Sequence, residues 1–140
     1  MAIRPRVLFL CTENTCRTQM AEAFLRDLAG DELEIVSAGG EPGRLDPDAV
    51  TAMREAGIDI SSAQAKVVDP YLRERFHYVI TLCDRAREHC PRFDFSETMH
   101  WTFQDPAQIV DAVSRKRAFD QVFAGLSQRV RYLIIVDEKT

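Results

Sequence analysis

Two kinds of hydrophobic pattern alternate along this chain, and the alternation restricts its fold more than any other feature. Short apolar runs rich in strand-forming residues have the length and composition of buried strands: RVLFLCT, LEIVSAG and FHYVITLC. Between and after them, apolar residues recur at helical spacing. Those residues are Met20, Ala21, Phe24, Leu25 and Leu28 in one segment, and Phe119, Val122, Phe123, Leu126, Val130 and Leu133 near the end. The pattern predicts one α/β domain over residues 1–140, a three-layer α/β/α sandwich around a parallel sheet of about four strands.

Turn and capping residues refine this prediction. A short strand is expected at MHWTF, and a helix over LDPDAVTAMREAG, with Asp46 as its cap and Gly57 past its end. The second Asp-Pro pair, at Asp69, predicts another helix start. The basic stretch SRKRAF is expected to be the solvated start of the last helix.

Composition excludes several classes of function. A formal net charge of -4 leaves no basic excess for nucleic acid or an anionic membrane. The longest apolar runs are far shorter than the roughly 20 residues of a membrane span, and the N-terminal run is shorter than the roughly 7–15 residues of a secretory signal core. We expect a cytoplasmic monomer, in which four cysteines are more typical of catalysis, redox chemistry or metal binding than of structural disulfides.

The segment CTENTCR, between a predicted strand and a predicted helix, has the form of an anion-binding loop. Backbone N–H groups of such a loop and the N-terminus of the next helix attract a tetrahedral oxyanion. Arg17 would bind the anion with two parallel hydrogen bonds. The same positive field would favour the thiolate of Cys11, a nucleophile. The alternative is that Cys11 is a buried thiol at a strand end. Cys16 is expected to pack in the core.

Cys11, Cys83 and Asp105 each follow a predicted strand. Loops at the carboxyl ends of parallel strands gather at one edge of the sheet, so we expect these three residues to meet. Asp105 could protonate a leaving oxygen, with Pro106 limiting its movement. Alternatively, Asp105 merely caps a helix.

Cys83 and Cys90 form a second cysteine pair, in LCDRAREHCP. In a regular helix their Cα atoms would be about 10.5 Å apart, whereas a disulfide needs roughly 4.4–6.8 Å. The polar segment between them would therefore have to unwind before the two cysteines could be oxidised. The alternatives are two packing cysteines or half of a zinc site, although zinc ligands usually have C-x2–4-C spacing. We expect no metal site.

The stretch VLFLCTENTCRTQMAEAF resembles the active-site loop of the low-molecular-weight tyrosine phosphatases and of their relatives, the thioredoxin-coupled arsenate reductases. The family pattern is C-x-G-N-x-C-R-[ST], and the resemblance continues through SAG at Ser37. It implies a low-molecular-weight phosphatase-like fold with Cys11 as nucleophile. The implied substrate-binding loop consists of Glu13, Asn14, Thr15, Cys16, Arg17 and Thr18. In the family the Asn shapes the loop, and the Ser/Thr hydroxyl bonds the nucleophilic sulfur.

QMAEAF and the Cys83/Cys90 pair look more like the reductases. The resemblance then implies that Cys11 attacks arsenate while Asp105 acts as acid. Cys83 displaces arsenite, Cys90 takes over the disulfide, and thioredoxin, with no bound cofactor, supplies the electrons. A weak phosphatase activity is also expected.

Two rival functions remain. One is a phosphatase for phosphate monoesters; against it, Ala107 and Gln108 stand where tyrosine phosphatases usually carry aromatic residues. The other is a non-enzymatic thiol redox sensor or arsenite-binding protein, which would not need Arg17, Asn14 or Asp105.

Two positions depart from the family. Some reductases of this group hold an alkali cation with the loop Asn, a helix acid, the SAG serine and a later Asp. Asn14, Glu22 and Ser37 match three of these, but Lys66 stands at the fourth, and our hypothesis is that its ammonium replaces the cation. Glu13 replaces a Gly. If that position needs a positive φ, it is strained; we expect its side chain to point to solvent.

Overall fold

The computed structural model of the chain describes residues 4–93 and 96–139. Four strands form one sheet in the order β2-β1-β3-β4, and every pair in it is parallel. They are β1 (Arg6–Cys11), β2 (Glu34–Gly39), β3 (Tyr78–Thr81) and β4 (Glu97–His100). The predicted small parallel sheet is therefore confirmed.

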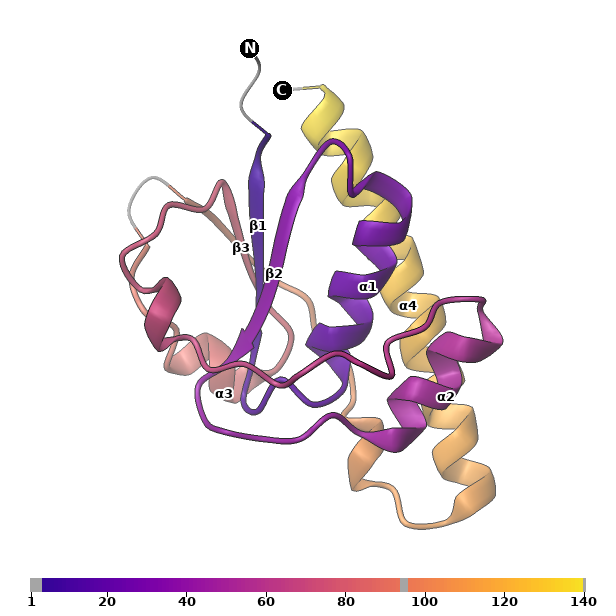
Figure 1. Cartoon of the computed structure of the whole chain (residues 1–140). Coiled ribbons are helices and arrows are strands. Elements are labelled where there is room, and N and C mark those ends of the chain that lie inside the picture. Colours follow the sequence, from indigo (N-terminus) through magenta and orange to yellow (C-terminus); the bar gives the residue numbers. More distant parts are fainter. Residues whose placement is uncertain (1–3, 94–95, 140) are drawn as a thin grey trace.

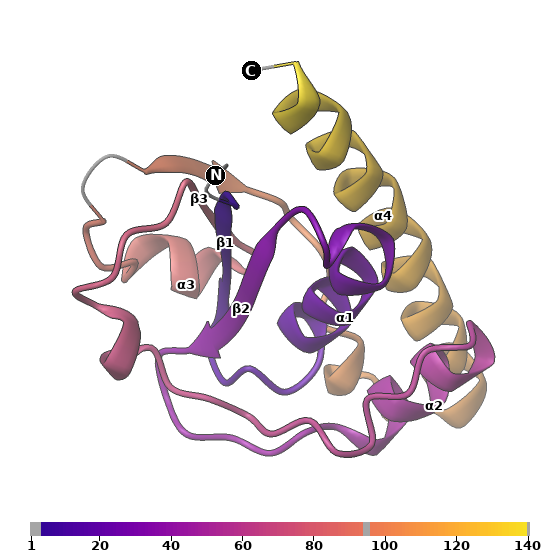
Figure 2. The same ribbon diagram turned by 45° about the horizontal axis from the view of Figure 1, so that its top comes forward.

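Helices cover both faces of this sheet unequally. On one face lie α1 (Arg17–Ala29), α2 (Pro47–Glu55) and the long α4 (Ala112–Glu138) (Figures 1 and 2). The other face carries a thinner layer, made of the 3₁₀ turn η1 (Asp69–Tyr71) and the short α3 (Asp84–Glu88). A second 3₁₀ turn, η2 (Pro106–Gln108), precedes α4. The result is the predicted α/β/α arrangement.

The central strand β1 is buried on both faces, as a parallel sheet requires. Because successive side chains point to opposite faces, Val7 and Phe9 join the larger core beneath α1 and α4, whereas Leu8 and Leu10 join a smaller core on the other face. This packing fixes Cys11 at the carboxyl end of β1.

The structure confirms some of the local expectations and corrects others. The Asp46 side chain accepts a hydrogen bond from the Asp48 N–H at the start of α2, and Gly57 has a positive φ of 81°. Asp69 was expected to start a helix, but it begins only a three-residue turn and does not cap it. The last strand, expected at MHWTF, spans Glu97–His100 instead. The N–H of the next residue, Trp101, still donates to the Thr81 carbonyl at 2.9 Å, and its ring is buried against Phe9.

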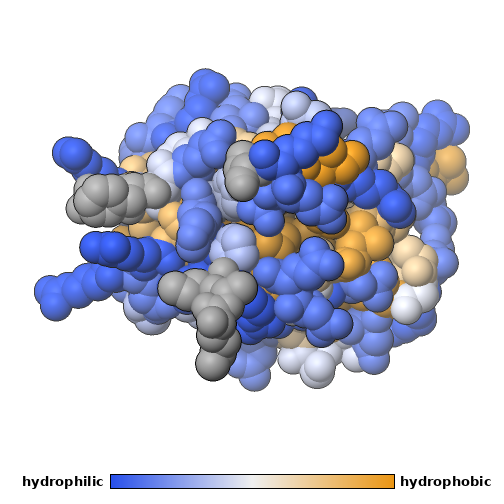
Figure 3. Space-filling model, turned by 90° about the horizontal axis from the view of Figure 1, so that it is seen from above, coloured by the Kyte–Doolittle hydropathy of each residue, from blue (hydrophilic) through white to orange (hydrophobic). Residues whose placement is uncertain are grey.

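All four strands run toward the same end of the molecule, where the loop after β1 lies (Figure 1). The opposite end, shown in Figure 3, is mainly hydrophilic with hydrophobic areas in between. Among the described helices, none has both the length and the apolar composition needed to cross a membrane.

Candidate active site

The loop from Cys11 to Arg17 adopts its shape by placing Asn14, rather than Glu13, in the left-handed region. Asn14 has φ 58° and is the only described non-glycine residue with a positive φ. The strain anticipated at Glu13 is thus absent, because asparagine tolerates this conformation better than most side chains. The Glu13 side chain is exposed, as expected. Its backbone is packed tightly: a Cβ at Gly39 would lie 2.6 Å from the Glu13 carbonyl carbon.

Hydrogen bonds fix the orientation of the buried Asn14 amide. The backbone N–H of Lys66 donates to Asn14 Oδ1 at 2.8 Å, and a backbone N–H can only donate. Gln19 Nε2 donates to the same oxygen at 2.9 Å. Asn14 Nδ2 must therefore be the donor to Thr18 Oγ1 (2.8 Å) and Ser37 Oγ (2.9 Å). Gln19 is buried and was missed in the sequence, because the helical pattern gives no sign of a buried glutamine.

This orientation directs a hydrogen bond at the Cys11 sulfur. Since Thr18 Oγ1 accepts from Asn14, its own hydrogen is free to point to Cys11 Sγ, 3.3 Å away. The Asn14 N–H also donates to Cys11 Sγ at 3.3 Å. Both contacts hold the Cys11 sulfur at the base of the loop. The expected contact between the Thr18 hydroxyl and Cys11 is therefore present in the structure.

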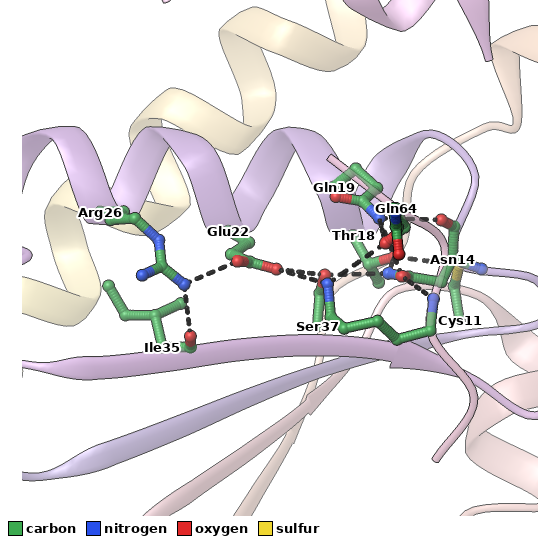
Figure 4. Close-up of polar contacts among 10 residues, drawn as sticks. Cys11, Asn14, Thr18, Gln19, Glu22, Arg26, Ile35, Ser37 and Gln64 are labelled. Carbon is green, nitrogen blue, oxygen red and sulfur yellow. Dashed lines mark hydrogen bonds and ion pairs between the residues drawn. The ribbon is translucent and has the colours of Figure 1, made fainter. Parts of the chain in front are cut away.

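A line of polar contacts continues from Asn14 to the middle of α1 (Figure 4). Ser37 Oγ accepts from Asn14 and donates to Glu22 Oε1 at 2.5 Å. Glu22 is also paired with two cations: Arg26 Nη2 at 2.7 Å and Lys66 Nζ at 3.4 Å. Lys66 thus contributes its N–H to Asn14 and its ammonium to Glu22. Within the described chain, no group of three or more His, Cys, Asp or Glu residues is arranged to hold a metal ion.

Arg17 and Asp105 face one hollow of about 270 Å³, which we call the anion hollow. It is lined by Cys11, Glu13, Thr15, Arg17, Asp105 and Gln108, among others. Arg17 Nη1 donates to the carbonyl oxygens of Phe103 (2.9 Å) and Leu82 (3.3 Å), and its Nη2 lies 3.7 Å from Asp105 Oδ2. The guanidinium is therefore held between the segments that lead to Cys83 and Asp105.

The two alternatives for Asp105 prove compatible. Its Oδ1 accepts the Ala107 N–H at 3.0 Å, so the residue caps η2. Its Oδ2 faces Arg17 and the Gln108 side-chain amide, 3.4 Å away. The capping bond thus orients the second oxygen into the anion hollow.

The second pair of cysteines lies beside the loop. Cys83 Sγ is 3.3 Å from Thr12 Oγ1 and accepts the Ala86 N–H at 3.4 Å as the cap of α3. Cys11 and Cys90 line a shared cavity of about 360 Å³, the thiol cavity. Burial raises the pKa of the Cys90 thiol. Cys11, Cys83 and Asp105 are thus brought to one edge of the sheet, as predicted.

Cys16 differs from the other cysteines. It is buried in the main core, and this burial, followed by the nearby carboxylate of Asp105, strongly raises the pKa of its thiol. The prediction that Cys16 is a packing residue agrees with this position.

The helix α3 is weakly held. None of its five residues is buried. Its main tethers are Arg85, paired with Glu41 at 2.6 Å, and Asp84, 3.1 Å from His100 Nε2. The exposed Arg85–Glu41 ion pair contributes about 0–1 kcal/mol. Unwinding α3 would therefore cost little.

A comparison of the whole chain with protein families gives one clear assignment. Residues 6–139 match the family described as low molecular weight phosphotyrosine protein phosphatase, to which this chain belongs.

Several relatives are arsenate reductases. The chain is 45% identical to the arsenate reductase of Bacillus licheniformis over 116 residues. This alignment covers 82% of this chain and 84% of that protein. A solved arsenate reductase in the phosphate binding state superposes with a TM-score of 0.82 at 30% identity, over 94% of this chain and 97% of that one. The thioredoxin-dependent arsenate reductase of Corynebacterium glutamicum has a TM-score of 0.76 at 28% identity, over 96% of this chain and 62% of that one.

Proposed function

We propose that this protein reduces arsenate to arsenite with three cysteines and that thioredoxin regenerates it. The observation that carries the proposal is the arrangement of thiols around Cys11. Cys11 lines both the anion hollow and the thiol cavity with Cys90, and Cys83 contacts the adjacent Thr12. Hydrolysis of a phosphate ester needs only the first of these thiols, whereas reduction of a substrate needs two electrons from a thiol pair.

The proposed reaction begins with arsenate in the anion hollow, bound by loop N–H groups and Arg17. The Cys11 thiolate attacks arsenic and displaces one hydroxyl, which takes a proton from Asp105 and leaves as water. The Cys83 thiolate then attacks the Cys11 sulfur. The bond between Cys11 Sγ and arsenic breaks, and its electron pair stays on arsenic, which leaves as arsenite. A Cys11–Cys83 disulfide forms at the same time.

The Cys90 thiolate attacks Cys83 in turn, which frees Cys11 and leaves a Cys83–Cys90 disulfide. Partial burial raises the pKa of the Cys90 thiol in the folded segment, so exposing Cys90 by unwinding α3 favours its reactive thiolate. Thioredoxin, a dithiol, then reduces the exposed bond. The cycle needs free thiols, so we assign the protein to the cytoplasm, where thiols stay reduced. We also propose that it acts as a single-domain monomer.

The phosphatase alternative is disfavoured by the entrance to the anion hollow. Gln108 lines it and Ala107 follows Pro106, so no aromatic side chain stands directly after the Asp-Pro pair to pack on a tyrosine ring. The thiol-sensor alternative leaves Arg17, Asn14 and Asp105 without a purpose.

One assay separates these functions. The protein is mixed with thioredoxin, thioredoxin reductase and NADPH, and NADPH loss is followed with and without arsenate. We expect arsenate-dependent loss, with one NADPH oxidised per arsenite released. Efficient hydrolysis of para-nitrophenyl phosphate without arsenate-dependent NADPH loss would instead identify a phosphatase. If the protein has neither activity, the thiol-sensor alternative is the one that remains.

We also propose that Lys66 takes the place of an alkali cation beside the loop. Its ammonium pairs with Glu22, which in turn accepts from Ser37, and its N–H holds Asn14. We therefore expect the melting temperature and the kcat/KM of the wild-type protein to be equal in potassium and sodium chloride at the same ionic strength. Lys66→Ala should make the melting temperature higher in potassium, whereas Arg26→Ala should not. A potassium-specific rise in the wild-type protein would contradict the proposal.

A further inference from the structure

Arg115, in the first turn of α4, joins the segment that carries Asp105 and Gln108 into the anion hollow to the segment that supports the anion loop. The basic stretch around it was expected to be a solvated helix start, and this was wrong for Arg115. Its Nη1 donates to the carbonyl oxygens of Ala107 (2.7 Å) and Ile109 (3.1 Å). Both carbonyls belong to the segment that starts at Asp105, so Arg115 anchors this segment from its far side.

The rest of the guanidinium binds the segment that supports the anion loop. Arg115 Nη2 contacts both carboxylate oxygens of Asp46, at 3.1 and 3.3 Å, and its Nε donates to Asp48. The Asp46 N–H donates to the Thr15 carbonyl in the loop at 2.9 Å. Gly43, in the same segment, is packed so closely that a Cβ there would lie 2.6 Å from Glu13 O.

This arrangement is more specific than a surface ion pair. All three guanidinium nitrogens are engaged, and the group lies 5.3 Å from the Phe119 ring. The hydrogen bond to Asp48, followed by the charge of Asp46, raises the pKa of Arg115. A lysine, with one compact ammonium, could not bind the two carbonyls and two carboxylates together.

We propose that Arg115 is a positioning residue for the reaction, because it fixes Asp105 relative to the anion loop by binding the Ala107 and Ile109 carbonyls and the Asp46 carboxylate simultaneously. The proposal rests on the proposed function of Asp105 as acid. The shortest contact of its carboxyl is the capping bond from the Ala107 N–H at 3.0 Å, while the contacts from Gln108 (3.4 Å) and Arg17 (3.7 Å) are longer, so its position depends on the backbone that Arg115 holds. A misplacement of about 1 Å in a catalytic group can cost on the order of 10²-fold in rate.

A double-mutant cycle on arsenate turnover tests this. Arg115→Gln is expected to lower kcat about 10- to 100-fold and to leave KM within about threefold, because Asn14 and Gln19 hold the anion loop independently. In an Asp105→Asn background the same substitution should have almost no further effect on kcat, because there is no acid left to position. Arg115→Lys should recover little. Lys116→Gln is the matched control: this neighbour pairs with Glu55 and Asp120 on the surface, and its loss should leave turnover unchanged.

Several results would overturn the proposal. An equal loss in the wild-type and Asp105→Asn backgrounds would show a merely structural effect, and a rise in KM with kcat unchanged would place the effect on binding. If Asp105→Asn itself leaves kcat unchanged, the acid role falls together with the proposal. If Asp105→Asn lowers kcat and Arg115→Gln does not, only the proposal falls.

Two arrangements keep the proposal testable. If Arg115→Gln does not fold, Arg115→Lys carries the cycle. If the wild-type protein does not turn over arsenate, the cycle is measured on hydrolysis of phenyl phosphate, whose leaving oxygen also needs a proton. The same pattern of non-additive losses is then expected, and additive losses would overturn the proposal.

Discussion

Arg17→Ala is expected to abolish arsenate turnover while leaving the binding of arsenite by the free thiols intact. In the structure the guanidinium lines the anion hollow and is held by the Leu82 and Phe103 carbonyls, so it is oriented before an anion arrives. Such preorganised donors act where charge develops, and removing a single one typically costs about 10²–10³ in kcat. Because Arg17 contributes a full charge and a two-pronged contact, we expect a loss of at least about 10³-fold.

The measurement is arsenite release from arsenate, compared with titration of the protein by arsenite. The two carbonyl contacts also stabilise the fold, so the melting temperature of Arg17→Ala is measured beside it. Losing hydrogen bonds of this kind costs about 1–3 kcal/mol for each group left unsatisfied. Arg17→Lys keeps the positive charge but cannot make the two parallel hydrogen bonds of a guanidinium, so it should recover only part of the rate. Turnover of Arg17→Ala within tenfold of the wild-type protein would contradict the assigned role.

The sequence was sufficient where the chemistry is local. The anion loop, its cysteine and its arginine occupy consecutive positions between a strand and a helix, so their spacing alone predicted the hollow. The meeting of Cys11, Cys83 and Asp105 followed from a general rule, that loops gather at the carboxyl ends of parallel strands.

The sequence failed where a side chain contacts a backbone carbonyl or a segment far away in the chain. Arg115 binds the carbonyl of Ala107 and the carboxylate of Asp46, 69 positions away in the chain. Carbonyl acceptors have no sequence signature, so SRKRAF looked like any solvated helix start. Glu13 shows the same limit: its backbone was suspected of strain, but the loop places the positive φ at Asn14, which only the three-dimensional contacts with Lys66 and Gln19 explain.

Cys90→Ser is expected to permit a single reduction and then stop. Cys11 and Cys83 are both present, so one arsenite should be released per protein molecule, and a Cys11–Cys83 disulfide should accumulate. Without the Cys90 thiol, no cysteine of the α3 segment can attack Cys83 and move the disulfide to the exposed Cys83–Cys90 position. Cys11 is buried, and thioredoxin must reach a sulfur to attack it. Thioredoxin-coupled NADPH oxidation should therefore fall to the level seen without arsenate.

The readouts are the arsenite released per protein and the mass of the cysteine peptides, which should show the Cys11–Cys83 pair joined with the loss of two hydrogens. Arg87→Ser is the matched control, because it lies in the same exposed helix and leaves all the thiols in place; it should turn over repeatedly. Full-rate cycling of Cys90→Ser would remove the third thiol from the mechanism and would mean that thioredoxin reaches the Cys11–Cys83 bond directly. The weak tethering of α3 points the other way. A helix with no buried residue, held mainly by one exposed ion pair and by the contact of Asp84 with His100, can unwind and bring Cys90 to Cys83.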